Sequence, residues 1–541
     1  YGDKVGIVPY VMPGFELAKA CADVFERNHD VEGLVLLNHG LFTFAETAQE
    51  SYERHIKLVT LAEEWLSNER ENLGKEFTGL EHVEEPSSLC AKVAPVLRRL
   101  IAAATGQQDH PYLNMVMDWR HSDEILDFVN CAEFLDLADT GPLTPDHVIR
   151  TKAYPLVISE PDWPNIDEQL TSAVTAYRKR YNEYFDCMIE SKKVERTRLD
   201  DFPRVVLIAG LGALCWGKSA KDARIAGDIT EHTISVKTLV HLTGQYNALP
   251  DEDLFDLEYW PLEQAKLGKG VEKPLARKVA LITGAAGAIG SAVAEVLIEQ
   301  GAHVVLTDIN AEQLTKTCAE LADKFGKDSR RGIVCDITDE NSVRDLFAEA
   351  VRQYGGVDIV VPNAGIAHSE PLADLSTEDW QRVQNVNVNG TFLVMREAAA
   401  LLTRQGLGGH IIVMGSKNVA APGAQFAAYS ASKAAVHQLA KVAALELAPQ
   451  GVRVNVLAPD AVFGDDGHAS GLWQEVGPGR AEAHGIDFGK LEEHYRARNL
   501  LKARVTGRHV GNAVVYLATN QTPTTGAILP IDGGIPAAFL R

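Results

Sequence analysis

The C-terminal half of the chain alternates short apolar segments with longer amphipathic ones. The apolar segments are Val279–Thr283, His303–Asp308, Gly332–Asp336 and Asp358–Asn363, and a segment with helical periodicity follows each of the first three. Such alternation predicts a parallel sheet whose strands are joined by right-handed helical crossovers. We therefore predict an α/β fold, a doubly wound parallel sheet with helices on both faces, over residues 278–541.

The N-terminal half has a less regular pattern. Within residues 1–75 we predict a helix over Gly14–Arg27, a short strand over Gly33–Leu37 and a polar helix from Thr47 to Asn68. Residues 76–265 mix loops and helices and form a connecting region. The charged stretch 266–277, which contains Gly and Pro, is predicted to be a linker to the alternating strand–helix pattern that follows.

Part of the connecting region repeats the first block. The segment that begins at Arg204 has the same order as the segment that begins at Leu34: an apolar strand, a short second strand and a Ser/Thr-capped helix, with an offset of 172 residues. This order indicates either an internal duplication or a chance similarity between two strand–helix units. Under that offset His39 falls on Leu211, so a second copy would lack this histidine.

Composition excludes some classes of function. A chain of 541 residues holds roughly two to four domains. Its formal net charge of −22 argues against nucleic acid and anionic membranes as partners. No run of 18 apolar residues appears, and the seven cysteines include no Cys-x-x-Cys pair, so we expect a cytoplasmic protein with reduced thiols. The opening at Tyr1, within an apolar segment, leads us to expect a truncated product.

A glycine-rich turn follows the strand Val279–Thr283. Gly284 permits a tight turn, and Gly290 lets the next helix pack closely, so the amides at the helix start can face a pyrophosphate. Asp308 ends the second strand, where its carboxylate can accept hydrogen bonds from both hydroxyls of an adenosine ribose. Because this carboxylate would repel a 2′-phosphate, we expect NAD rather than NADP; the alternative is a solvated Asp that caps the strand.

These features resemble the short-chain dehydrogenase/reductase family. Thr283-Gly-x-x-x-x-x-Gly290 resembles its coenzyme loop, with Ala288 in place of the usual middle glycine; Asp336 resembles its adenine-binding acid, and Pro362–Gly365 its Asn-Asn-Ala-Gly signature. The resemblance implies a Rossmann domain that binds NAD through Thr283, Gly284, Gly287, Ile289, Gly290, Asp308, Asp336, Ile337, Asn363, Ala364, Gly365, Tyr429, Lys433 and Pro459.

Four residues match the catalytic tetrad of this family. Tyr429 and Lys433 are four residues apart and so share a helix face, Ser416 lies 13 residues before Tyr429, and Asn387 precedes them in Asn-Val-Asn-Gly. Tyrosine is a poor base near neutrality. We expect the Lys433 ammonium and the charge of an oxidised nicotinamide to lower its pKa from about 10 by roughly three units, about 4 kcal/mol. Ser416 would hold the substrate oxygen, and Asn387 a water that connects Lys433 to solvent.

The segment after the sixth strand departs from the family. The family usually has Pro-Gly here, whereas this chain has Pro459-Asp460, followed by a long insert up to about Asn499. Segments in this place commonly close over substrate, so we expect a lid. The sequence does not indicate which of its residues contact the substrate.

Asn38-His39-Gly40 resembles the C-terminal part of class II aldolases of the adducin type. Those enzymes bind zinc through a His-x-His pair and a later histidine, which His39 matches as an ancestral ligand. None of the 17 histidines lies two residues from another, and one imidazole does not make a catalytic zinc site. The fold prediction is therefore a partial aldolase-like α/β domain before the Rossmann domain, and zinc-dependent aldol cleavage is expected only in a full-length parent.

The order of blocks resembles one fusion family. An aldolase-like unit, the segments Gly141–Lys152 and Phe255–Lys266, and a C-terminal dehydrogenase ending in Ile535–Arg541 together resemble the bifunctional rhamnulose-1-phosphate aldolase/lactaldehyde dehydrogenase family. This resemblance implies oxidation of L-lactaldehyde in L-rhamnose catabolism. Typical aldehyde dehydrogenases use a cysteine thiolate, but we expect Cys335 to be structural and the Tyr/Lys/Ser site to act on the aldehyde hydrate.

Two other functions stay open. One is a polyol or sugar-alcohol dehydrogenase whose N-terminal half serves only as a scaffold. The other is a non-catalytic NAD-binding or oligomerisation module, which the complete set of Tyr429, Lys433, Ser416 and Asn387 disfavours. In each enzyme interpretation the partner is a small-molecule substrate, and the family resemblance implies a homo-oligomer, either a dimer or a tetramer.

Overall fold

The structure is a computed structural model and describes residues 1–73, 85–268, 270–465 and 468–539. The chain forms two compact units. The N-terminal unit comprises Tyr1–Leu89, Asp118–Gly217 and Asp222–Gly270, and the C-terminal unit comprises Cys90–Met117, Lys218–Lys221 and Val271–Arg541. The expected boundary at residues 75 and 76 lies outside the described residues. Cys90–Met117, expected in the connecting region, belongs instead to the C-terminal unit.

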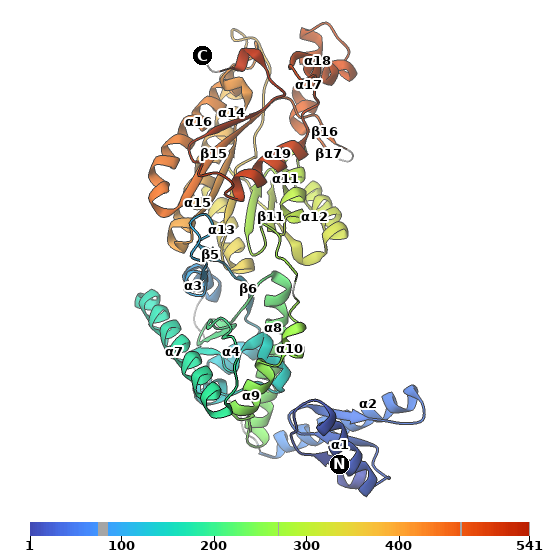
Figure 1. Ribbon diagram of the computed structural model, residues 1–541. Coiled ribbons are helices and arrows are strands. Elements are labelled where there is room, and N and C mark those ends of the chain that lie inside the picture. The colour runs from blue at the N-terminus through green and yellow to red at the C-terminus, as the bar shows by residue number, and fades with distance from the viewer. Residues whose placement is uncertain (74–84, 269, 466–467, 540–541) are drawn as a thin grey trace. The chain divides into compact units, whose positions relative to one another are not determined.

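The C-terminal unit is built on a seven-stranded sheet, which confirms the predicted α/β class (Figure 1). All its strands run parallel, in the order β12-β11-β10-β13-β14-β15-β18. Their bounds are β10 Val279–Thr283, β11 His303–Asp308, β12 Arg330–Val334, β13 Ile359–Val361, β14 Gly409–Met414, β15 Val452–Pro459 and β18 Ile528–Ile531. The order reverses between β10 and β13, and ligands of such sheets bind beyond the strand ends at that point.

Helices cover both faces of this sheet. Successive residues of β10 point to opposite faces: Val279 and Leu281 pack on one side, Ala280 and Ile282 on the other. The central strands β10, β13 and β14 are buried on both faces and almost wholly apolar, as their sequences predicted, whereas β12 and β18 are partly exposed. One face packs against α13 (Glu340–Tyr354), α15 (Thr391–Gln405) and α16 (Ala427–Leu447), and the other against α11 (Ala288–Glu299), α12 (Ala311–Phe325) and α19 (Gly507–Ala518).

A buried ion pair ties Cys90–Met117 to this sheet. Arg98, on α3 (Pro86–Leu100), donates from Nη2 to Oδ2 of Asp358 at 2.7 Å and from Nε to the carbonyl of Met115 at 2.8 Å. Asp358 also accepts hydrogen bonds from Asn114 and from the amide of Val279 at the start of β10. Burial alone would raise the pKa of Asp358, but the Arg98 guanidinium and Lys278 outweigh it, so this pKa lies below its ordinary value.

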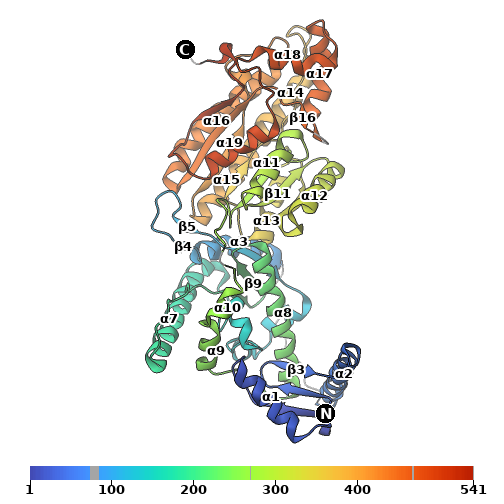
Figure 2. The same ribbon diagram turned by 45° about the vertical axis from the view of Figure 1, so that its right-hand side comes forward.

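The segment after β15 forms a small cap on the C-terminal unit. It contains the hairpin β16 (Gly464–Asp465) and β17 (His468–Ala469), then α17 (Gly471–Ala483) and α18 (Leu491–Arg498), which lie side by side in both ribbon views (Figures 1 and 2). Phe463 stacks on Trp473 of α17, and Tyr495 of α18 packs edge-on against both rings, so these aromatic contacts join the two helices. The described part of the segment expected as a lid is therefore largely helical.

The N-terminal unit contains the repeated strand–helix pattern. In the first copy β2 (Gly33–Leu36) pairs with β3 (Gly40–Thr43), and Leu36 faces Gly40; in the second, β8 (Val205–Ile208) pairs with β9 (Gly212–Gly217), and Ile208 faces Gly212. Both registers and the starts of the following helices, α2 (Ala48–Leu73) and α8 (Ala220–Thr243), share the offset of 172 residues. This agreement favours duplication over chance similarity.

Other elements complete the two units. The first copy includes β1 (Val5–Val8) and α1 (Phe15–Arg27), and the second lies in a sheet of order β6-β9-β8-β7. The remaining strands and main helices are β4 (Ala103–Ala104), β5 (Tyr112–Leu113), β6 (Val116–Arg120), β7 (Leu156–Ile158), α4 (Asp123–Val129), α5 (Phe134–Ala138), α6 (Val148–Thr151), α7 (Ile166–Lys192), α9 (Asp251–Glu258), α10 (Pro261–Ala265) and α14 (Thr377–Gln384).

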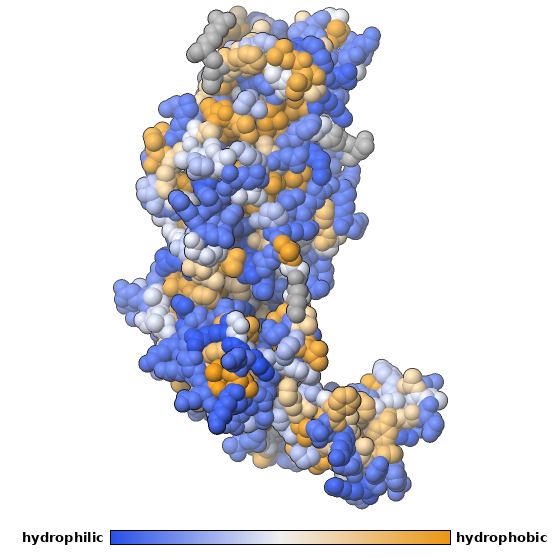
Figure 3. Space-filling view, viewed as in Figure 1, coloured by the Kyte–Doolittle hydropathy of each residue, from blue (hydrophilic) through white to orange (hydrophobic). Residues whose placement is uncertain are grey.

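Hydrophilic and hydrophobic residues are interspersed on the face shown in Figure 3. Within the described part of the chain, none of the helices combines the length and apolarity needed to span a bilayer.

Candidate active site

The glycine turn after β10 has the conformation that its sequence predicts. Gly284 has φ +62°, and a Cβ there would lie 2.8 Å from the Cα of Ala364, so only glycine fits. A Cβ at Gly290 would overlap the carbonyl oxygen of Gly284. Because glycine has no Cβ, α11 can approach the turn closely. The N-terminal end of α11 therefore opens onto the strand ends, where its free amides can meet an anion.

A cavity of about 480 Å³ lies at these strand ends. Most residues predicted for the site line it: Gly284, Gly287, Ile289, Asp308, Asp336, Ile337, Asn363, Ala364, Gly365, Ser416, Tyr429, Lys433 and Pro459. Three predicted residues, Thr283, Gly290 and Asn387, do not line it and lie behind its wall. The structure thus brings together residues that lie up to 175 positions apart along the chain.

Thr283 and Asn363 shape the coenzyme loop from behind. The Thr283 hydroxyl accepts hydrogen bonds from the amides of Asn363 and Ala364, at 3.0 and 3.1 Å. The Asn363 side chain donates in return to the carbonyls of Thr283 and Gly284. These bonds join the ends of β10 and β13 at the point where the strand order reverses.

Two acids stand at the expected coenzyme end of the cavity. Asp308 accepts hydrogen bonds from the amides of Ala286 and Asn310, which fix its carboxylate at the end of β11. Asp336 accepts from the amide and the hydroxyl of Thr338. Both carboxylates line the cavity, so each is placed to meet the adenosine part of a dinucleotide.

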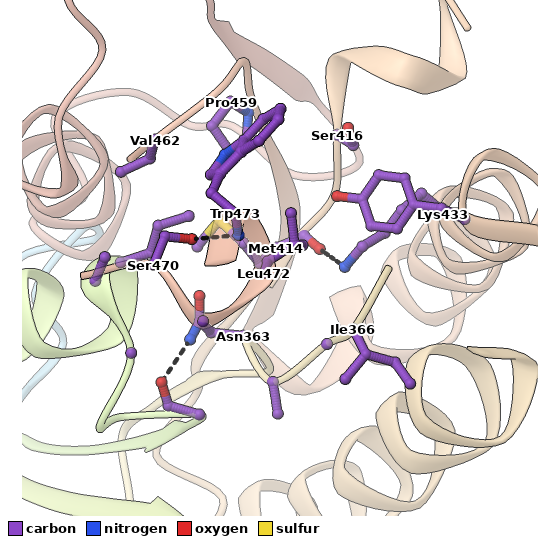
Figure 4. Close-up of a pocket in the computed structure, with 18 of the residues that line it drawn as sticks. Asn363, Ile366, Met414, Ser416, Lys433, Pro459, Val462, Ser470, Leu472 and Trp473 are labelled. Carbon is purple, nitrogen blue, oxygen red and sulfur yellow. Dashed lines mark hydrogen bonds between the residues drawn. The ribbon is translucent and has the colours of Figure 1, made fainter. Parts of the chain in front are cut away.

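Tyr429, Lys433 and Ser416 meet on one wall of the cavity. Tyr429 and Lys433 stand one turn apart on α16, with the Lys433 Nζ 5.9 Å from the centre of the tyrosine ring. Lys433 donates to the carbonyl of Met414 at 2.8 Å, which anchors it under the end of β14. Ser416 follows that strand, and Figure 4 shows it on the same side of the pocket as Lys433, with Trp473 facing them.

The expected lowering of the tyrosine pKa is not found in the protein alone. Burial raises the pKa of Tyr429, and a hydrogen bond with Ser416 offsets this only in part. Burial also lowers the pKa of Lys433 to about 8. The expectation combined the charges of Lys433 and an oxidised nicotinamide, so the protein alone tests only part of it. In the protein alone, the cost of removing the phenolate from water dominates the pKa of Tyr429.

Asn387 supports the wall from behind. It lies fully buried in a short π-helix, Asn385–Gly390. Its side chain accepts a hydrogen bond from the amide of Ile366 and donates to the carbonyl of Ile366 and the hydroxyl of Ser432, each at 2.9 Å. A Cβ at Gly365 would lie 3.1 Å from Asn387 Oδ1 and 3.4 Å from Lys433 Nζ, so the asparagine and the lysine border the same glycine.

Sequence reasoning missed the charged residues at the other end of the cavity. Lys417, Asp460, Arg480 and Arg498 all line it, together with Trp473. The position of Lys417 directly after Ser416 could have indicated that Lys417 lies near the cavity. Arg480 and Arg498 belong to the insert between residues 460 and 499 and have no motif, so only the packing of α17 and α18 shows where they point.

Of the remaining chemical candidates, Cys335 lines the cavity and His39 does not. Cys335 is buried and accepts a hydrogen bond from Ser342, and burial raises the pKa of its thiol, which agrees with a structural role rather than that of a thiolate nucleophile. His39 contacts the carbonyl of Val11 through Nε2 at 2.9 Å and stacks on Tyr10. Among the described residues, the one grouping with metal-ligand geometry is His368, Glu370 and Asp379, and it does not include His39.

Comparison with known proteins identifies the class. The family model described as "short chain dehydrogenase" matches residues 278–469. "Class II Aldolase and Adducin N-terminal domain" matches residues 1–66, and "Aldolase class II, second domain" matches residues 88–267. The chain belongs to the short-chain dehydrogenase family, joined to class II aldolase sequence, and the predicted fusion architecture is confirmed. It is an oxidoreductase of the type that uses a nicotinamide coenzyme.

Individual relatives cover the whole chain or its C-terminal half. The chain is 34% identical to the uncharacterized oxidoreductase YuxG of Bacillus subtilis over 100% of its own length and 78% of that protein. It is 35% identical to D-threitol dehydrogenase of Mycolicibacterium smegmatis over 48% of this chain and 92% of that one. A crystal structure of 3-ketoacyl-(acyl-carrier-protein) reductase from Brucella melitensis complexed with NADH is 27% identical, covers 48% of this chain and 97% of its own, and gives a TM-score of 0.42.

Proposed function

We propose that the protein catalyses the NAD-dependent oxidation of a small hydroxy-aldehyde or alcohol, with L-lactaldehyde from L-rhamnose breakdown as the substrate. The observation that carries this proposal is the convergence of Tyr429, Lys433 and Ser416 on a cavity whose other end holds Asp308. Lactaldehyde as substrate is supported by the resemblance of the block order to the aldolase/lactaldehyde dehydrogenase fusions.

The coenzyme end of the cavity fits NAD. Gly284 and Gly287 leave room beside the N-terminal end of α11, whose amides can bind a pyrophosphate. Asp308 can accept hydrogen bonds from the two ribose hydroxyls, and its charge disfavours a 2′-phosphate. When bound, the oxidised nicotinamide supplies the hydride acceptor and a positive charge.

Asp308→Ser is expected to change the coenzyme preference. Loss of the carboxylate removes two charge-assisted hydrogen bonds to the ribose, so kcat/KM with NAD should fall about tenfold or more, while kcat/KM with NADP should rise. Initial rates with both coenzymes measure this change, and Asp323→Ser, at an exposed position on α12, is the matched control. An unchanged NAD-to-NADP ratio in Asp308→Ser would contradict the role given to Asp308.

The catalytic wall supplies the proton chemistry. Tyr429 takes the proton of the substrate hydroxyl, Ser416 donates a hydrogen bond to the same oxygen, and the Lys433 ammonium stabilises the phenolate. For an aldehyde, the hydrate presents both a hydroxyl and a hydrogen on the reacting carbon. Loss of that hydrogen as hydride and of the hydroxyl proton to Tyr429 leaves a carboxylic acid, so no cysteine nucleophile is needed.

This chemistry predicts how the rate depends on pH. The base is the phenolate of Tyr429, whose pKa is raised by burial, so kcat/KM for oxidation should rise about tenfold per pH unit between pH 6 and 8. Carbonyl reduction uses the protonated tyrosine and should show no such rise. Initial rates in both directions across this range test the assignment, and oxidation that slows as pH increases would contradict it.

Product analysis tests the proposed substrate. With L-lactaldehyde and NAD, we expect equimolar NADH and L-lactate, detected by absorbance at about 340 nm and by chromatography. If the protein instead reduces L-lactaldehyde to 1,2-propanediol with NADH and forms no lactate with NAD, the proposed aldehyde oxidation is excluded. The reaction would then be that of an alcohol dehydrogenase. We propose no zinc-dependent aldol cleavage by this chain, because His39 is its one match to the zinc ligands of the aldolases.

A polyol or sugar alcohol is the second candidate substrate. The similarity to D-threitol dehydrogenase, 35% identity over 92% of that protein, favours it. On this proposal the aldolase-like half serves as a scaffold. Rates with D-threitol and related polyols, measured beside those with L-lactaldehyde, separate the two candidates.

We also propose a cytoplasmic homo-oligomer, either a dimer or a tetramer. Location in the cytoplasm is supported by the seven cysteines, all of which are free thiols. Self-association is supported by exposed apolar side chains on neighbouring helices: Phe392 on α15, and Val442 and Leu445 on α16. Light scattering of the purified protein measures the oligomeric state, and a monomer at micromolar concentration would contradict this proposal.

A further inference from the structure

Three cationic side chains gather where the substrate would lie. Lys417 follows Ser416, Arg480 projects from α17, and Arg498 ends α18; all three line the cavity. The two arginines lie close enough to Lys417 that, after burial, their charges help to lower its pKa. One carboxylate on the cavity wall, Asp460, faces this group.

Asp460 does not neutralise the three cations. It accepts hydrogen bonds from Nη2 of Arg498 at 3.2 and 3.3 Å, and it lies 3.9 Å from Nζ of Lys417. Asp532 acts electrostatically on Lys417 but does not line the cavity. With all three side chains protonated, the cations exceed the lining carboxylate at this end by two charges.

Arg480 is the buried member of the group and lacks an acidic partner. Its side chain is held in place, because Nη1 donates to the carbonyl of Ala424 at 2.8 Å and the guanidinium lies 4.9 Å from the ring centre of Phe426. It is only 6% exposed, its Nε has no hydrogen-bond partner, and its Nη2 lies 3.3 Å from Nε2 of His484. None of the ion pairs among the described residues includes Arg480. A buried guanidinium without a counter-ion is costly unless an anion completes the site.

The position of this group assigns it to the substrate rather than to the coenzyme. Arg480 bonds to residues 424 and 426 just before Tyr429, and Lys417 is adjacent to Ser416. The glycine turn, Asp308 and Asp336 occupy the other end of the cavity. An anion bound by Arg480 would therefore lie beyond the reacting hydroxyl, on the side away from the adenosine-binding acids.

We propose that Arg480, assisted by Lys417 and Arg498, binds an anionic oxygen group of the small hydroxy compound on which the dehydrogenase acts. The group is the carboxylate of a hydroxy acid or the phosphate of a phosphorylated hydroxy compound. This inference rests on the proposed function and deepens it, since it makes an anion-bearing ligand the preferred class. In aldehyde oxidation the product carboxylate forms at the reacting carbon, so the group that Arg480 would bind is a second, more distant anion. Neutral L-lactaldehyde and neutral polyols carry no such group.

Binding to the NADH complex tests the proposal without turnover. L-Lactate is compared with 1,2-propanediol, and glycerol 3-phosphate with glycerol, by calorimetry or by the fluorescence of bound NADH. In at least one pair the anion should bind about tenfold tighter than its neutral partner, because hydrogen bonds between an anion and a guanidinium are stronger than those of a neutral hydroxyl. The pair that shows this difference identifies the anion as carboxylate or phosphate.

Substitutions of Arg480 and Lys417 test whether these cations cause the preference for an anionic ligand. Arg480→Gln should abolish the difference between anion and neutral partner while the Kd for NADH stays within about twofold, and Lys417→Gln, at a less buried position, should reduce it. Arg344→Gln, an exposed arginine paired with Glu340 on α13, is the matched control and should change neither value. Equal binding within both pairs of compounds, or a difference that survives in both variants, would overturn the proposal.

The same experiment separates this proposal from the proposed function. Failure to bind NADH would contradict the proposed dehydrogenase function itself. Normal NADH binding with no preference for anions would contradict only the proposed anion subsite. A folded Lys417→Gln protein keeps the test decisive even where Arg480→Gln does not fold.

Discussion

Replacing Tyr429 by phenylalanine is expected to lower kcat for NADH formation about 10³-fold, the typical contribution of a positioned proton acceptor. The ring of Tyr429 packs against Phe426, so the phenylalanine variant keeps this contact and loses only the hydroxyl. The coenzyme-binding residues at the far end of the cavity stay in place, and the Kd for NADH should change less than about twofold. Steady-state rates and NADH fluorescence titration measure the two quantities.

A matched tyrosine controls for nonspecific effects. Tyr516 lies on α19 and is partly exposed, with its hydroxyl near Thr522, and it does not line the cavity. Tyr516→Phe should leave kcat unchanged. Residual activity within tenfold of the wild type in Tyr429→Phe would exclude Tyr429 as the proton acceptor. A large rise in the Kd for NADH would instead indicate that the variant disturbs the cavity.

The second large effect concerns stability. Arg98→Met is expected to lower the free energy of unfolding of the C-terminal unit by about 3–5 kcal/mol, because the buried Asp358 loses its hydrogen-bonded counter-ion and keeps only Lys278, at 3.9 Å. Asp358 also accepts hydrogen bonds from the amide of Val279 and the side chain of Asn114. The substitution should therefore destabilise the start of β10 as well as Cys90–Met117. Chemical denaturation followed by circular dichroism, with the transition of each unit fitted separately, measures the change.

Two comparisons make this prediction specific. The double variant Arg98→Met, Asp358→Asn removes both charges and should recover part of the lost stability. Arg344→Met breaks an exposed pair with Glu340, and such pairs contribute about 1 kcal/mol or less. Equal losses in Arg98→Met and Arg344→Met would show that the buried pair does not anchor Cys90–Met117.

The central strands of the C-terminal unit could be predicted closely, and its outer strands less so. Residues Val279–Thr283 and His303–Asp308 form strands over the predicted ranges, because burial on both faces leaves a continuous apolar signal. The edge strand β12 runs over Arg330–Val334, two residues earlier than predicted. Its side chains are largely exposed, so its register is set by hydrogen bonds to β11 rather than by an apolar pattern.

The placement of the proposed catalytic residues on one wall of the cavity was predictable because local geometry fixes their spacing. Tyr429 and Lys433 need only one helical turn to share a face, and Ser416 needs only the end of a strand. The contact of Arg98 with Asp358 joins residues 260 positions apart, and nothing in the sequence near either residue indicates it. The placement of Arg480 depends in the same way on how α17 packs, so its role in the cavity could not be read from the insert.

The measurement that most directly tests the central claim is NADH formation by the wild-type protein, followed at about 340 nm with NAD and a panel of small compounds. The panel contains L-lactaldehyde, other hydroxy-aldehydes, vicinal diols, D-threitol and further polyols, and hydroxy acids. We predict turnover with at least one small hydroxy-aldehyde or alcohol, and none in Tyr429→Phe. NADH binding in titrations, without turnover of any compound, would contradict the account and favour a non-catalytic coenzyme-binding module.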